Sequence, residues 1–134
     1  MASELKVDKF TGVTTAGSIL VTGEGNSTTT NLQQGLAKCW CSWNDSTVIQ
    51  DSFNTSSLDD DSTGVTTVNY SSNFGNDDYA IGATCRQSST GGDAFMRLSN
   101  IRETGRQKFT CVNSDTGNDF DGETQTVLFA GDLA

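Results

Sequence analysis

The sequence predicts an all-β protein, an antiparallel β-sandwich of the jelly-roll-like or immunoglobulin-like kind with an extended N-terminal arm. Threonine and serine supply 19 and 15 of the 134 residues. Threonine favours pleated surfaces, whereas serine, asparagine and glycine favour turns. Short apolar–polar alternations recur at near-regular spacing between turn residues, and long amphipathic runs are missing. This pattern is typical of a β-sandwich.

The first 34 residues differ from the rest of the chain. Two weak strands are expected there, at 5–10 and 18–22, separated by a glycine-bearing segment. Neither strand can bury much surface alone. We therefore interpret residues 1–34 as an N-terminal attachment arm, ordered by pairing with another chain, with a flexible terminus as the alternative. Residues 35–134 are predicted to form the β-sandwich domain.

The sandwich domain begins near the stretch LQQGLAKCWCSW, residues 32–43. Strand alternation places Cys39, Cys41 and Trp43 on one face and Trp40 on the other. Asp59 to Asp61, with the Ser-Thr-Gly that follows, are predicted to form a turn. The remaining strands are expected at 48–53, 65–70, 79–85, 94–100, 106–112 and 124–130.

The cysteines do not have the spacing of a zinc site, which requires paired Cys-x-x-Cys turns. Cys39 and Cys41 are separated by one residue, and Cys85 and Cys111 stand alone within alternating apolar sets. A buried free cysteine behaves as a small hydrophobic residue. We interpret all four as reduced core residues, with a disulfide between the sheets and a metal site as the alternatives.

No other group of residues predicts catalysis. The chain has no histidine, which excludes an imidazole base, a Ser-His-Asp triad and a histidine metal ligand. No spaced carboxylate pair indicates a glycosidase cleft. Acidic residues that could bind Ca²⁺ lack EF-hand spacing, so solvated loops are the simpler interpretation; they are Asp59, Asp60, Asp61, Asp77 and Asp78. We expect no enzyme, no catalytic, cofactor-binding or metal-binding residues and no cofactor.

The charge balance limits the partners. The net charge is −9, from 17 acidic and 8 basic residues, which argues against nucleic acid and anionic membranes. No apolar run has the length of a membrane span. The start, MASELKVDKF, lacks the apolar core of a signal peptide, so synthesis in a cytoplasm is expected. Five bases gather in one stretch, as a solvated sheet face or as a ridge for acidic residues of a second copy: Arg86, Arg97, Arg102, Arg106 and Lys108.

Several segments of the chain follow one pattern, which ends with VLFAGDLA. Its other residues are Gly35, Leu36, Ala37, Lys38 and Trp40, then Ser52, Phe53 and Asn54, then Thr67, Val68, Asn69 and Tyr70, then Tyr79 and Ala80. This pattern resembles a β-sandwich module of tail-fibre and other small virion proteins of marine bacteriophages, and the similarity covers most of residues 20–134. The chain departs from the module at Cys39 and Cys41, where small or aliphatic residues are common.

The resemblance implies a non-enzymatic structural protein of a virion assembled in the host cytoplasm. Its partners would be further copies of the chain, as a homotrimer, and other virion proteins of the tail or capsid. A short tail fibre, a capsid-surface protein and an accessory tail or baseplate piece remain open. The alternatives are a host-surface glycan adhesin, with Phe74 and Phe120 as the exposed loop aromatics, and a capsid decoration protein. The loops at 88–93 and 113–122 would then face outward.

Overall fold

The computed structural model describes residues 4–13, 19–22, 29–32, 35–87 and 94–134. The chain divides into two compact units, Met1–Leu36 and Ala37–Ala134. In the first unit, β1 (Leu20–Thr22) and β2 (Thr29–Asn31) form a two-stranded antiparallel hairpin. The prediction of a strand at 5–10 was wrong, because these residues have no β partner. Ser18, the predicted start of the second strand, lies outside the described residues.

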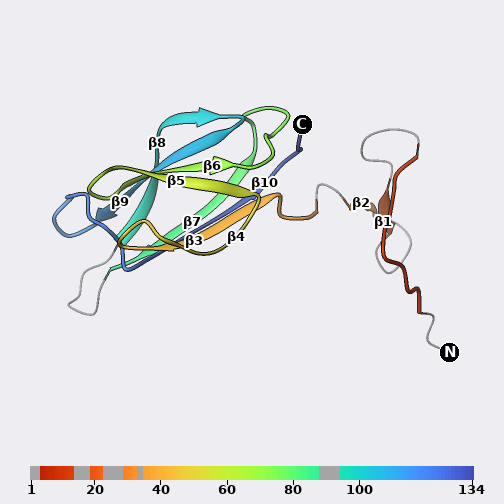
Figure 1. Ribbon diagram of the computed structural model, residues 1–134, viewed down its shortest axis with the longest axis horizontal. Helices are drawn as coiled ribbons and strands as arrows, with labels where there is room; N and C mark the ends of the chain where they lie inside the picture. The colour runs from red at the N-terminus through yellow and green to blue at the C-terminus, as the bar shows by residue number, and fades with distance from the viewer. Residues whose placement is uncertain (1–3, 14–18, 23–28, 33–34, 88–93) are drawn as a thin grey trace. The chain divides into compact units, whose positions relative to one another are not determined.

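The second unit is a sandwich of two four-stranded antiparallel sheets, which confirms the predicted fold class (Figure 1). The first sheet, with order β4-β3-β10-β7, contains β3 (Cys39–Asn44), β4 (Ile49–Phe53), β7 (Ala80–Arg86) and β10 (Thr124–Ala130). The second sheet, with order β5-β6-β9-β8, contains β5 (Thr55–Ser62), β6 (Val65–Tyr70), β8 (Ala94–Glu103) and β9 (Arg106–Asn113). We call them the β3 sheet and the β9 sheet.

The turn predicted from Asp59 to Gly64 is confirmed at Thr63 and Gly64, where the chain reverses. Its first part was wrong, because Asp59 to Asp61 belong to β5. Gly64 has a φ of +72°, a left-handed conformation that side chains rarely adopt. A Cβ atom there would also lie 2.6 Å from the backbone nitrogen of Phe120. Asp is common in turns, and this preference led to the prediction. Here the aspartates lie in an exposed strand, where other side chains donate hydrogen bonds to two of their carboxylates.

Asn54 carries the chain from the β3 sheet to the β9 sheet. It lies between β4 and β5 with a positive φ of 58°. Its side-chain nitrogen donates to the carbonyl oxygens of Lys38 and Ser72, each at 3.0 Å. Its side-chain oxygen accepts from the backbone nitrogen of Ser72 at 2.7 Å. Asparagine tolerates this conformation, and its amide holds three segments together at the sheet switch.

The core lies between the two sheets and is rich in aromatic side chains. Cys39, Cys41 and Trp43 are fully buried, as the alternation predicted, whereas Trp40 on the other face is partly exposed. The remaining buried apolar residues come from both sheets and from the segments that join them: Val68, Tyr70, Phe74, Tyr79, Phe109, Cys111, Val112, Val127 and Phe129.

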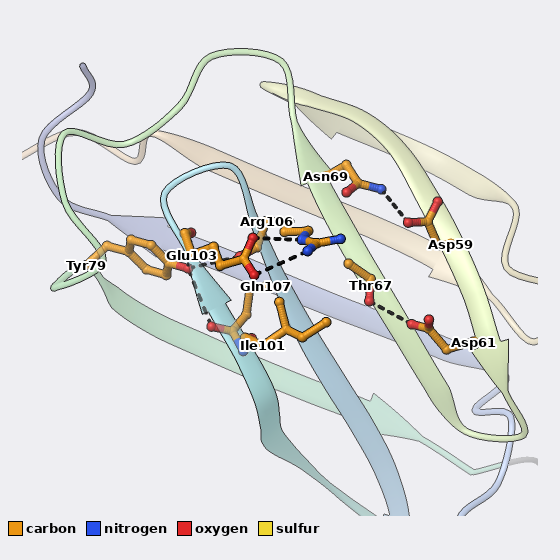
Figure 2. A network of polar contacts seen from close by, with 9 residues as sticks. All are labelled: Asp59, Asp61, Thr67, Asn69, Tyr79, Ile101, Glu103, Arg106 and Gln107. Carbon is orange, nitrogen blue, oxygen red and sulfur yellow. Dashed lines mark hydrogen bonds and ion pairs between the residues drawn. The ribbon is translucent and has the colours of Figure 1, made fainter.

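A fully buried glutamine completes the core at an irregularity of β8. The register of β8 against β9 shifts between Leu98 and Arg102. Gln107 donates from its side-chain nitrogen to the carbonyl oxygen of Ile101 at 2.7 Å (Figure 2). The Tyr79 hydroxyl donates to the Gln107 side-chain oxygen at 3.4 Å and to the Glu103 carbonyl oxygen at 3.0 Å. The buried amide is thus satisfied, as burial of a polar group requires.

We predict that Trp43→Ala lowers the free energy of unfolding by about 3–5 kcal/mol, because truncating a buried aromatic side chain leaves a cavity. Trp40→Ala, three residues away on the outer face, should cost less than half as much. Urea denaturation followed by circular dichroism measures both variants. Equal midpoints for the two variants would contradict the assignment of Trp43 to the core.

Candidate functional site

The cysteines do not gather into a metal-binding group within the described residues. All four are free; Cys39, Cys41 and Cys111 are buried, and Cys85 is half-buried. The Cys39 thiol contacts the Asn54 carbonyl oxygen at 3.7 Å and the Thr55 hydroxyl at 3.5 Å. Burial raises the pKa of Cys39 and of Cys41 to about 11. At neutral pH these thiols are protonated and behave as small core residues.

Two of the three acidic residues of β5, Asp59 and Asp61, bind neighbouring side chains. The Asn69 amide donates to the Asp59 carboxylate at 3.0 Å, and the Thr67 hydroxyl donates to Asp61 at 2.6 Å (Figure 2). Lys108 forms an ion pair with Asp61 at 3.2 Å. Within the described residues, no group of three or more acidic or cysteine side chains could hold a metal ion.

The basic cluster has its partners within the same chain. Arg97 pairs with Asp119 at 3.2 Å, and Arg86 pairs with Glu123 at 3.5 Å. Arg102 lies 4.9 Å above the Tyr79 ring and donates to the Tyr79 carbonyl oxygen at 2.6 Å. Asp61 of β5 also pairs with Lys108 of this cluster at 3.2 Å. Within the described residues, these basic side chains therefore already have partners in the same chain.

The outer face of the β9 sheet carries a network of polar contacts. Arg106 forms two bonds with the Glu103 carboxylate, at 2.9 and 3.2 Å, and lowers the pKa of that carboxyl group. The Thr67 hydroxyl, and then Lys108, lower the pKa of Asp61. Exposed ion pairs of this kind contribute about 0–1 kcal/mol each. The network does not cover the whole sheet, because Phe95 and Leu98 on β8 are each 48% exposed.

The outer face of the β3 sheet carries a row of apolar residues. Trp40 on β3 lies directly opposite Phe53 on β4 and Leu128 on β10, and Leu128 lies opposite Gly82 on β7. Phe53 is 52% exposed and Leu128 48%. A Cβ atom added at Gly82 would meet nothing within 4 Å, so the row ends on a low, open surface. Contiguous exposed apolar residues of this kind mark interaction sites.

The edge strands of the sandwich are not equally protected. Natural proteins protect edge strands against pairing with charges, bulges or short strands. β5 has Asp59 to Asp61 and two register shifts, and β8 has Arg97, Arg102 and one shift. β4 is short, with Asp51 and a shift. β7 has no charge from 80 to 85, pairs with β10 without a shift, and exposes most of its side chains.

β7 is the least protected edge in the described part of the chain. The uncharged run AIGATC could have indicated this from the sequence, since exposed edge strands normally carry a charge. The sequence could not indicate which strands lie at edges. The apolar row is similar: each outward residue is visible in the alternation, but their alignment depends on strand register.

The loop aromatics proposed for glycan contact are not both available. Phe74 is buried, only 2% exposed, and packs against Tyr70 and Tyr79 with ring centroids 5.1 and 4.5 Å away. The assignment of Phe74 as an exposed loop aromatic was therefore wrong. The ring of Phe74 lies in the core because the burial of a large aromatic side chain lowers the free energy of the folded state. Phe120 is partly buried, and the 88–93 loop lies outside the described residues.

Comparison with known proteins identifies no relative: no protein-family model, curated protein or solved structure matches the chain. In the part of the chain that the structure describes, no helix has the length and apolar character to cross a membrane. The candidate site therefore rests on the fold alone. It comprises the β7 edge and the apolar row formed by Phe53, Trp40 and Leu128.

We predict that Asp61→Asn lowers stability at pH 7 by about 0.5–1.5 kcal/mol, the usual net value of a hydrogen bond. Because the folded pKa of Asp61 is depressed, its contribution is present above the ordinary value of 3.8 and is lost as pH falls through the folded value. The difference from wild type should therefore fade in acid. Urea titrations between pH 7 and pH 3 measure it, and an equal loss in the neighbouring variant Asp60→Asn would contradict the assignment.

Proposed function

We propose that this chain is a non-enzymatic structural protein of a bacteriophage virion, a short tail fibre or fibre-like surface protein. It assembles as a homotrimer through sheet edges and attaches to the particle by its N-terminal arm. Its other partners are virion proteins of the tail or capsid, and it assembles in the host cytoplasm. The proposal combines the resemblance of its segments to phage sandwich modules with one structural observation, the unprotected edge strand β7.

The β7 edge supports assembly for a physical reason. An edge strand exposes backbone N–H and C=O groups that pair readily with another strand. Ala80 to Cys85 are small or uncharged, so a second backbone can approach without repulsion. A three-fold ring needs a heterologous contact, so β7 would pair with a different strand of the next copy. The apolar row ends at Gly82 on the same edge and would extend the buried area.

The N-terminal arm supports attachment. Its hairpin pairs only three residues on each strand, Leu20 with Asn31 at one end and Thr22 with Thr29 at the other. An isolated two-stranded hairpin is marginally stable in water. Several apolar side chains in this unit are exposed, with Leu5 at 74% and Val13 at 91%. Such a segment gains order when another surface covers it, which is the property an attachment arm requires.

A host-surface glycan adhesin is the second candidate. The observation that favours it is the pairing of Trp40, which is partly exposed, with Phe53, which is 52% exposed, because aromatic faces are suited to binding the apolar faces of sugar rings. Trp40→Ala separates the two candidates. Loss of binding to host cells with an unchanged oligomer mass would favour the adhesin, whereas loss of assembly would favour the structural protein.

We predict that the wild-type protein is trimeric at micromolar concentration and that Thr84→Lys weakens the trimer. A lysine on an exposed strand edge opposes strand addition by charge and desolvation. Gln50→Lys adds the same charge to β4 and is the matched control. Light scattering coupled to size exclusion measures the mass, with circular dichroism to confirm folding. A monomeric wild-type mass, or equal dissociation of both variants, would count against assembly through β7.

We further predict that a chain beginning at Ala37 remains folded but fails to enter particles. The sandwich unit Ala37–Ala134 contains both four-stranded sheets and the aromatic core, so it does not need the arm for stability. Urea denaturation and an in vitro incorporation assay with particles that lack the protein measure the two properties. Normal incorporation of the shortened chain would move the attachment surface to the sandwich.

A further inference from the structure

Two cysteines from opposite sheets meet at one end of the core. Cys85 lies on β7 of the β3 sheet, and Cys111 lies on β9 of the β9 sheet. Two residues beyond each cysteine, the Asn113 side-chain nitrogen donates to the Gln87 side-chain oxygen at 2.8 Å, which holds the ends of β9 and β7 together. The two thiols lie close enough for each to affect the pKa of the other. The two cysteines are 26 positions apart in the chain, so their proximity is produced by the packing of the sheets.

The surroundings of the pair are closely packed. A Cβ atom at Gly122 would lie 3.2 Å from the Cys111 sulfur and 3.3 Å from the Arg86 carbonyl oxygen. The Gly122 backbone also hydrogen-bonds to the Cys111 thiol. A glycine at this position therefore lets β7 and the Cys111 sulfur approach across the core. Because Arg86 directly follows Cys85, this close approach independently places Cys111 next to the end of β7.

The pair differs from the other two cysteines in solvent access. Cys39 and Cys41 are fully buried on one strand and contact Thr55. Cys85 is only half-buried and lies on the edge strand β7, whereas Cys111 is buried on β9. A partly exposed thiol next to a buried one is the arrangement needed for a two-step exchange.

We propose that Cys85 and Cys111 form a redox-sensitive latch, in which a low-molecular-weight disulfide oxidises them to a covalent bridge between the two sheets. This inference concerns the sandwich itself and does not depend on the role proposed above. The pair would be reduced in a cytoplasm, where thiols are kept reduced, and would form the disulfide in an oxidising environment.

The chemistry proceeds by thiol–disulfide exchange. The Cys85 thiolate attacks one sulfur of the small disulfide, and the other half leaves as a thiolate that takes up a proton. The Cys111 thiol then loses its proton and attacks the Cys85 sulfur, which breaks the mixed disulfide and releases the second small thiol. Two electrons pass from the cysteine pair to the small disulfide, and two small thiols are formed.

The geometry sets the order and the pace of these steps. We expect Cys85 to react first because it is the less buried of the two, and Cys111 to resolve the mixed disulfide because it lies on the facing strand end. Burial raises the pKa of both thiols above the ordinary value of 9.0. Since the thiolate is the nucleophile, oxidation should be slow at neutral pH and accelerate about tenfold per pH unit toward alkaline conditions.

The test incubates the reduced native protein with oxidised glutathione at pH 7.5 and pH 8.5. We expect the loss of two hydrogen atoms in the intact mass, and a non-reduced digest in which the Cys85 and Cys111 peptides are linked. The melting temperature should rise by about 10 °C, because the bridge closes a loop of about 27 residues and limits the unfolded chain. Addition of dithiothreitol should reverse both changes.

Two variants keep the test decisive. Cys41→Ser retains the pair and should still form the bridge. Cys85→Ser, at a half-exposed position that tolerates the change, should form neither the bridge nor a stable glutathione adduct in the native state. A glutathione adduct that persists on Cys85 in the wild-type protein would overturn the proposal. So would a bridge between Cys39 and Cys41, or no reaction at pH 8.5 under conditions in which the urea-denatured chain reacts.

Discussion

The structure depends on one contact between its two sheets, the packing of Phe129 against aromatic rings from the opposite side. Phe129 lies on β10, a central strand of the β3 sheet, with its ring centroid 5.1 Å from Tyr70 and 6.0 Å from Phe109 of the β9 sheet. Tyr79 and Phe74 close the same cluster, 5.7 and 6.1 Å from Phe129. Edge-to-face pairs add about 0.5–1.5 kcal/mol each beyond the area they bury.

This concentration of aromatic rings explains how a chain with 34% hydrophobic residues can form a sandwich. The rings occupy the volume that aliphatic side chains fill in richer cores, and small residues such as Cys39 and Cys41 fit around Trp43. Some apolar residues of the sandwich nevertheless remain exposed, among them Phe53, Leu128 and Phe95. The row of Trp40, Phe53 and Leu128 is distinguished by its alignment across three strands, and contiguous apolar residues of this kind mark interaction sites.

The two outer faces differ in what they can recognise. On the β9 sheet, Asp61 binds Thr67 and Lys108, and Glu103 binds Arg106, so the charges satisfy one another. On the β3 sheet, the apolar row leads to an edge strand with no charge before Arg86. We propose that the first face meets solvent and the second meets another copy. The latch between Cys85 and Cys111 lies at the same edge and would brace β7 against the opposite sheet.

The sequence by itself determined the fold class, the core strand around Trp43 and most strand positions, because period-two alternation and turn residues are local signals. It misplaced Asp59 to Asp61, since their strand depends on donors from β6 and β9 that lie far along the chain. It also misjudged Phe74, because only packing reveals that a loop ring lies inside. Only the tertiary structure decided the order of the strands, the position of the uncharged strand β7 at an edge, and the approach of Cys85 to Cys111. Each depends on which distant strands pair and in which register, and register is a property of the whole packed molecule.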